Sequence, residues 1–177
     1  RIPWNPMSDA ITPRHEVQTL VDTVYEKIRP LAGGEVATYI PELGKANPDD
    51  FGVSLVTADG RVFEAGDCGR EFTIQSISKP FMFGMALEEC GREAVFERVD
   101  VEPSGDAFNA IELQKITNRP HNPMVNAGAI TISALLHARH GEGALSHVLS
   151  RFSAFAGRPL SIDEAVYESE RRTGHRN

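Results

Sequence analysis

The stretch Gln75-Ser76-Ile77-Ser78-Lys79-Pro80-Phe81 constrains the fold of this chain more than any other. Pro80 lacks an N–H and disfavours helical geometry at Lys79, so a helix can begin here but cannot run through from far upstream. Residues 81–87 are apolar, and Gly91 is typical of a helix end. The stretch therefore predicts an apolar helix with Ser76 at its N-cap or in its first turn.

Ser76 and Lys79 are three residues apart, a spacing that puts both side chains on one face of a helix. Burial and the positive end of the helix dipole both favour a neutral lysine, which can take the serine proton. Unpaired N–H groups at the helix start can hold an oxyanion. The pattern Ser-x-x-Lys is nevertheless common by chance, and the alternative is an N-cap serine beside a solvated lysine.

Length and charge narrow the class of protein. At 177 residues the chain is long enough for one domain with a sizeable core. Its net charge is −7 without a basic stripe, which argues against nucleic acid or an anionic membrane as a partner. No apolar run reaches transmembrane length, and the N-terminus lacks the apolar core of a signal peptide. We expect residues 1–14 to be a lead-in or cloning-derived segment ahead of a folded part at 15–177.

The cysteines and histidines give weaker signals. Cys68 and Cys90 show neither metal-binding nor redox spacing, which favours two reduced thiols in a cytoplasmic protein. His137 and His140 lie three residues apart at a predicted helix end, where a metal pair is conceivable. No third ligand of suitable spacing is nearby in the sequence, so we favour a solvated helix end and expect no metal or cofactor.

Hydrophobic periodicity and turn residues predict the remaining elements. Helices are expected at 16–28, 125–138 and 144–156, the last of these with Leu145 and Phe155 facing inward. A further helix is expected to open with a capping box at 161–164, and a hairpin to form at 51–56 and 61–65. Residues 101–123 are expected to form an irregular loop, apart from a short element near 111–116, and such loops often line a site. A two-stranded hairpin alone is marginal, so the layout resembles part of a wider sheet.

Five segments, taken in order and approximate spacing, resemble the serine-dependent glutaminase family, which shares the fold of β-lactamases and penicillin-binding proteins. They are Tyr39–Leu43, Gln75–Lys79, Glu102–Asn109, His121–Ile130 and Ser169–Asn177. The similarity covers most of the chain from about Tyr25 onward. It implies an α/β (α+β) fold with helices packed on an antiparallel sheet, incomplete in this chain. Residues 15–177 are then expected to be the N-terminal part of a catalytic domain.

The resemblance implies hydrolysis of L-glutamine to L-glutamate and ammonia through a glutamyl-serine intermediate, in a homo-oligomer (dimer or tetramer) without a cofactor. Ser76 resembles the nucleophile and Lys79 the lysine that activates it. The residues that resemble substrate contacts are Tyr39, Ser76, Asn126, Glu170 and Asn177. A carboxylate such as Glu170 suits the ammonium of free glutamine, and the two amides suit its carboxylate.

Each of these substrate contacts has a plainer alternative. Glu170 is then a solvated helix residue, Asn126 an N-cap, Asn177 a frayed terminus and Tyr39 part of the core. The chain also departs from the family pattern, because His175 stands where the family usually has Asp. The family's domain is longer, and its C-terminal part carries two active-site tyrosines, further sheet strands and an oxyanion donor. We therefore expect the 177-residue chain alone to be inactive.

Two further readings remain open. A penicillin-recognising serine hydrolase of the same fold also resembles the chain at Ser76 and Lys79. Its second motif usually starts with a serine or tyrosine that carries a proton, whereas this chain has Met124 there, two residues before Asn126. The other reading is a catalytically silent fragment that acts by binding a partner.

Overall fold

The computed structural model describes residues 14–31, 33–105, 107, 109–110 and 112–173. The chain divides into two compact units, Arg1–Phe72 and Thr73–Asn177. In the described residues, no helix has both the length and the apolar character that crossing a bilayer requires.

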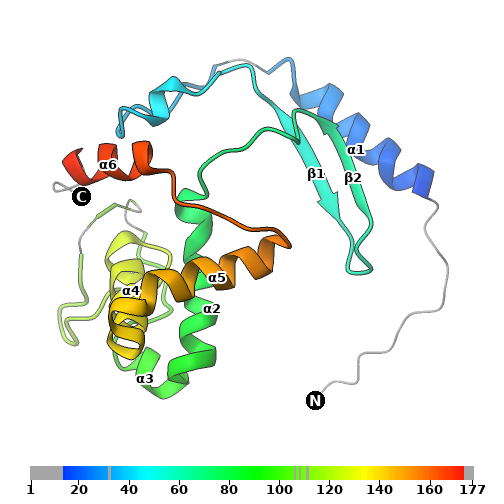
Figure 1. Cartoon of the computed structure of the whole chain (residues 1–177). Helices are drawn as coiled ribbons and strands as arrows, with labels where there is room; N and C mark the ends of the chain where they lie inside the picture. The colour runs from blue at the N-terminus through cyan, green and yellow to red at the C-terminus, as the bar shows by residue number, and fades with distance from the viewer. Residues whose placement is uncertain (1–13, 32, 106, 108, 111, 174–177) are drawn as a thin grey trace. The chain divides into compact units, whose positions relative to one another are not determined.

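The first unit is a helix packed on a hairpin (Figure 1). Helix α1 (Arg14–Ile28) contacts strands β1 (Gly52–Val56) and β2 (Val62–Gly66), which pair antiparallel from Gly52 opposite Gly66 to Val56 opposite Val62. A short 3₁₀ turn, η1 (Leu43–Lys45), precedes the hairpin. The helix and both strands lie within two residues of their predicted bounds.

Val21 and Phe63 form the centre of this packing and are 2% and 1% exposed. The Tyr25 ring stacks on Phe51 with 5.5 Å between ring centroids. The apolar stripe of α1 is wider than the hairpin, so Leu20 remains 58% exposed. The apolar face of α1 is therefore only partly covered.

The second unit is a helical cluster built on α2 (Ser78–Cys90) and α4 (Asn126–His140), which pack against each other (Figure 1). The shorter α3 (Arg92–Phe96) follows α2, and α5 (Ala144–Ala156) follows α4 through the 3₁₀ turn η3 (Gly141–Gly143). The buried core shared by these helices consists of Met85, Ala86, Val95, Val99, Ile132, Leu136 and Phe152. Helix α5 has its predicted bounds, and α2 ends before Gly91 as predicted.

Two local predictions in this unit are corrected. Leu145 and Phe155 were expected to face inward from α5, but they are 62% and 51% exposed. Phe155 instead packs at the rim against Phe81, with ring centroids 5.5 Å apart. The last helix, α6 (Glu164–Thr173), starts too late for Ser161 to cap it. Asp163 takes that position, and its Oδ1 accepts the Val166 N–H at 3.0 Å.

The segment between α3 and α4 is irregular, as predicted, and side chains hold it in place. Asp100 Oδ2 accepts hydrogen bonds from Gln114 Nε2 at 2.8 Å and from Arg119 Nη2 at 3.1 Å. The hydrogen bond from Gln114 is the main cause of a lowered pKa at Asp100. The short element expected near 111–116 is reduced to one isolated bridge between Leu113 and Pro120.

Gly128, in the first turn of α4, lies against the end of this loop. A Cβ at Gly128 would stand 1.9 Å from the carbonyl oxygen of Asn122 and 2.7 Å from its carbonyl carbon. Both atoms belong to the backbone, so the loop itself would have to move. Only glycine fits this close approach without distortion.

We expect Gly128→Ala to lower the free energy of unfolding by about 1–3 kcal/mol or more, the usual cost of overpacking. Gly84→Ala is the matched control, because Gly84 lies within α2 and an added Cβ there meets nothing within 4 Å. It should stabilise the protein by about 0.5–1 kcal/mol, since alanine favours a helix over glycine. Urea unfolding measures both variants. Equal stabilities for the two would contradict the close approach at Gly128.

Candidate active site

Ser76 is exposed and lies in the 3₁₀ turn η2 (Gln75–Ile77), directly before α2. This is the predicted location at a helix start. The preceding residue, Gln75, has a φ of 43°, in the left-handed region that residues other than glycine seldom adopt. Ser78 supports this backbone, since its Oγ donates to the Gln75 carbonyl oxygen at 2.7 Å. Backbone strain of this kind is common at functional sites, where contacts with the surrounding structure stabilise the strained conformation.

Lys79 is half-buried in the first turn of α2. Its Nζ donates a hydrogen bond to Oδ1 of Asn126 at 2.8 Å. Burial lowers the pKa of the Lys79 amine, because desolvation disfavours the charged form. Asn126 is a neutral partner, so it orients the amine without adding a counter-charge. A lysine in this setting is better suited to accept a proton than a solvated one.

Asn126 is the first residue of α4, and Val125 occupies the N-cap position, without a side-chain cap. The alternative that Asn126 is an N-cap is therefore wrong. The loop end is fixed instead by Asn122, whose Oδ1 accepts the N–H groups of Met124 at 3.0 Å and Val125 at 3.2 Å. This turn leaves the Asn126 amide available to Lys79, across the packed helices α2 and α4.

The N–H groups around Ser76 are less available than predicted. The Ile77 N–H donates to the Ile74 carbonyl at 3.0 Å. The Ser78 N–H donates to the carbonyls of Gln75 and Ser76. These two donors are used within the turn, so they are poor candidates for an oxyanion site.

The remaining predicted residues are spread along the chain. Tyr39 belongs to the first unit and is 56% exposed, which argues against the alternative of core packing. Glu170 is exposed on α6 in the second unit. Asn177 and His175 lie outside the described residues. Lys79 and Asn126 are thus the predicted site residues that a hydrogen bond joins in the described part of the chain.

The family model described as Glutaminase matches residues 34–177. This chain belongs to the glutaminase family.

Curated members of the glutaminase family are similar along most of the chain. Glutaminase 2 of Bradyrhizobium diazoefficiens is 52% identical over 164 residues, which is 93% of this chain and 26% of that protein. The glutaminase of Trichormus variabilis is 49% identical over 159 residues, which is 90% of this chain and 48% of that protein. The chain thus spans about a quarter to a half of the length of these two relatives.

Solved glutaminase structures share the fold. The crystal structure of Mglu in its tris and glutamate form has a TM-score of 0.84 and 41% identity, covering 93% of this chain and 37% of that chain. A probable glutaminase from Bacillus subtilis, complexed with 6-diazo-5-oxo-L-norleucine, has a TM-score of 0.75 and 35% identity, covering 97% and 51%. The predicted fold class, helices with an antiparallel sheet in the β-lactamase-like arrangement, is confirmed.

Sequence reasoning missed one polar cluster in this chain. His137 is exposed, but His140 is not at a solvated helix end, because its ring contacts Glu89 and His147. A third possible ligand, Glu89, does lie close to His140 and His147 in the folded chain. It is distant in sequence and reaches the histidines through helix packing. The seven-residue spacing of His140 and His147 across Gly141 was the one local signal available.

Proposed function

We propose that this protein hydrolyses L-glutamine to L-glutamate and ammonia, with Ser76 as nucleophile and Lys79 as proton carrier. Membership of the glutaminase family supports the reaction class. One observation supports the roles of nucleophile and proton carrier. The half-buried Lys79 amine is held by Asn126 at 2.8 Å, and Lys79 lies three residues after the exposed Ser76. Serine activation needs a base, and an amine with a lowered pKa three residues after an exposed hydroxyl is a candidate for that base.

In the proposed reaction, the Ser76 oxygen forms a bond to the side-chain amide carbon of glutamine while its proton passes to Lys79. The C–N bond then breaks, and the leaving nitrogen takes that proton, so ammonia departs and a glutamyl-serine ester remains. Water attacks the ester, a proton returns to the Ser76 oxygen, and glutamate leaves. Lys79 must be neutral at the start of each half-reaction, which its desolvation favours.

The test is a comparison of substrates in purified protein that spans the full length of its relatives, because the 177-residue chain alone is expected to be inactive. Ammonia release should be measured with L-glutamine, and cleavage of nitrocefin should be measured in parallel. We expect turnover of glutamine and none of nitrocefin, because Met124 cannot carry a proton where penicillin-recognising enzymes use a hydroxyl. Treatment with the diazoketone 6-diazo-5-oxo-L-norleucine, followed by peptide mass spectrometry, should place one adduct on Ser76. Nitrocefin cleavage without glutamine turnover would reject the proposal.

We infer from the family resemblance that Tyr39, Asn126, Glu170 and Asn177 contact the substrate. Glu170 is the best-defined case, because an exposed carboxylate can pair with the α-ammonium of free glutamine. Asn126 already holds Lys79, so its amide N–H groups are the part that can reach a substrate carboxylate.

Glu170→Gln is expected to raise KM for glutamine by about 10-fold with a smaller change in kcat, because a charge-assisted hydrogen bond to the substrate is lost. Glu168→Gln is the matched control on the same helix. The Glu168 carboxylate pairs with Arg171 at 3.0 Å, and the hydrogen bond from Arg171 is the main cause of its lowered pKa. Steady-state kinetics should show KM within about two-fold of the wild type for the control. A similar KM in both variants would remove Glu170 from the substrate site.

We also infer that the protein works in the cytoplasm and as a homo-oligomer, a dimer or tetramer. The first inference is supported by Cys68 and Cys90, which are both free thiols. The second rests on the family resemblance alone. Size-exclusion chromatography with light scattering tests the oligomer, and a monomeric mass at micromolar concentration would reject it.

A further inference from the structure

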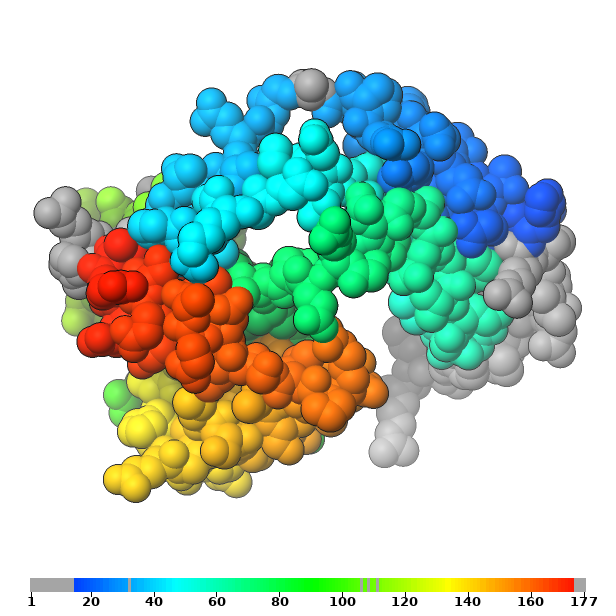
Figure 2. Space-filling model, turned by 45° about the horizontal axis from the view of Figure 1, so that its top comes forward, coloured from blue at the N-terminus to red at the C-terminus, as the bar shows by residue number. Residues whose placement is uncertain are grey.

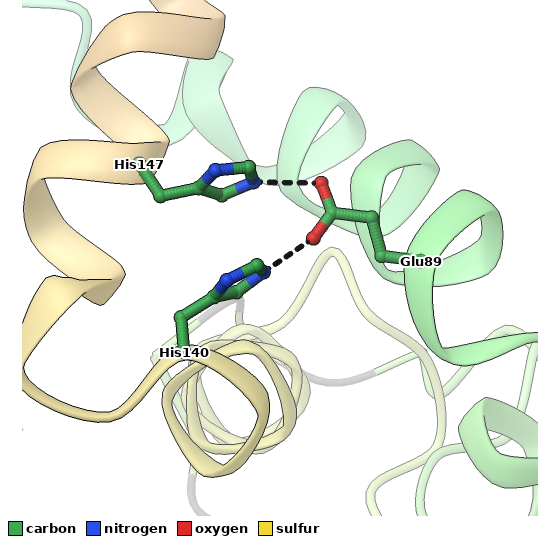
Figure 3. Close-up of side chains that lie close together, drawn as sticks. All are labelled: Glu89, His140 and His147. Atoms are coloured by element: carbon green, nitrogen blue, oxygen red, sulfur yellow. Dashed lines mark hydrogen bonds and ion pairs between the residues drawn. The ribbon is translucent and has the colours of Figure 1, made fainter.

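Three side chains from three helices converge in the second unit: Glu89 near the end of α2, His140 at the end of α4 and His147 in the first turn of α5 (Figure 3). Nε2 of His140 lies 2.6 Å from Oε2 of Glu89, and Nε2 of His147 lies 2.8 Å from Oε1. The two imidazole rings stack with 4.0 Å between their centroids. Both rings therefore point their Nε2 atoms at one carboxylate.

Local structure explains how the two histidines meet. Gly141, with a φ of 59°, ends α4, and the turn η3 reverses the chain into α5. The side chains of Glu89, His140 and His147 are 13%, 24% and 32% exposed, so the cluster is largely buried but still in contact with solvent. The end of α4 and the start of α5, coloured yellow to yellow-orange, lie on the surface seen in Figure 2. Because the three side chains are partly exposed, an ion could reach them without unfolding the helices.

The Glu89 carboxyl is ionised in this setting. Its burial raises the pKa, but the hydrogen bonds from His147 and His140 outweigh burial and leave the pKa below its ordinary value. Each imidazole accordingly donates its Nε2–H to a carboxylate oxygen. One anionic oxygen ligand and two imidazole nitrogens are thus held together, with their ligand atoms within 4.8 Å of one another.

We propose that Glu89, His140 and His147 form a binding site for one divalent transition-metal ion of the zinc class. Two imidazoles and a carboxylate suit zinc, cobalt or nickel, whereas magnesium and calcium prefer oxygen ligands alone. Three protein ligands leave a fourth position for water, as in open zinc sites. This proposal is independent of the glutaminase reaction, since none of the three residues has a role in it.

Metal binding requires the three side chains to rearrange. Ligand atoms of a tetrahedral zinc site stand about 3.4 Å apart, given metal–ligand bonds of about 2.1 Å. The two N···O distances of 2.6 and 2.8 Å must therefore open by less than about 1 Å, and the rings must turn so that their lone pairs converge. Each neutral imidazole must also carry its proton on Nδ1 in place of Nε2, so that the Nε2 lone pair is free for the metal.

The bound ion would join α2, α4 and α5 at one end of the second unit. Lys79 and Asn126, at the starts of α2 and α4, already join these two helices at their other ends. Metal binding should consequently stabilise the packed pair, and the thermal midpoint of unfolding should rise with zinc concentration.

The test uses metal-free protein without a histidine tag. Calorimetric titration with zinc chloride should show one ion per chain, and cobalt chloride should give the visible absorption of a four-coordinate site. His147→Gln and Glu89→Gln should each weaken zinc binding by about 10-fold or more, because each removes one ligand. His137→Gln is the matched control, since His137 is exposed on α4 outside the cluster, and it should bind zinc as the wild type does.

Two results would overturn the site. One is the absence of stoichiometric zinc binding, which would leave the cluster as a hydrogen-bonded clamp between helices. The other is zinc binding that Glu89→Gln and His147→Gln leave unchanged, which would locate the ion elsewhere. Circular dichroism checks folding of each variant. If His147→Gln fails to fold, Glu89→Gln decides, because glutamine keeps the size of the side chain and its Oε1 can still accept one imidazole hydrogen bond.

Discussion

Replacing Ser76 with alanine is expected to abolish glutamine hydrolysis, with a loss in kcat of at least about 10³-fold, because the chemical step would lose its proposed nucleophile. The fold should survive, since Ser76 is exposed and substitutions at exposed sites usually change stability by about 0.5 kcal/mol or less. The measurement is ammonia release from glutamine, with circular dichroism to confirm the folded state. Residual activity above a few per cent would remove Ser76 from the nucleophile role.

Ser78→Ala is the matched control in the same motif. The Ser78 hydroxyl donates to the Gln75 carbonyl and supports the left-handed turn before Ser76, so its loss should cost about 1 kcal/mol of stability. Turnover should fall by less than about 10-fold, since Ser78 is a positioning residue with no part in the chemistry. Equal losses in the two variants would mean that the turn geometry, rather than the Ser76 oxygen, carries the effect.

The sequence was most informative where local signals agree. Apolar periodicity, Pro80 and Gly91 predict α2, and Gly157, with a φ of 66°, ends α5 where expected. The hairpin β1–β2 follows from alternation and the turn around Gly60. These features depend on residues close in the chain, whose backbone preferences are nearly independent of the rest of the fold.

Predictions failed where distant packing decides. Periodicity places Leu145 and Phe155 on the apolar face of α5. It cannot predict how much of that face the neighbouring helices cover, and both side chains are exposed. The pairing of Lys79 with Asn126 joins residues 47 positions apart. It depends on the Asn122 turn and on Gly128, whose close approach to the loop no local pattern reveals. Glu89 meets His140 and His147 for the same reason.

Lys79→Arg is expected to lower kcat by about 10²–10⁴-fold, the range that general base catalysis contributes. A guanidinium stays charged at every accessible pH and cannot take the Ser76 proton. The pH profile of the wild type supplies a second measurement. Burial lowers the pKa of Lys79, and only the neutral amine is active, so kcat should rise with pH as Lys79 loses its proton and then level off. If Lys79→Arg kept this rise of kcat with pH, the titrating group would be one other than Lys79.

Asn126→Asp separates the two roles proposed for Asn126, which are holding the Lys79 amine and contacting the substrate carboxylate. A carboxylate 2.8 Å from the Lys79 amine would stabilise the ammonium and raise its pKa, so the rising limb of kcat should move to higher pH and the lost activity should return in alkaline buffer. If Asn126 acts only on the substrate carboxylate, the new negative charge repels the substrate instead. KM would then rise at all pH values while the kcat profile stayed in place, and the hydrogen bond between Lys79 and Asn126 would have no part in tuning the base.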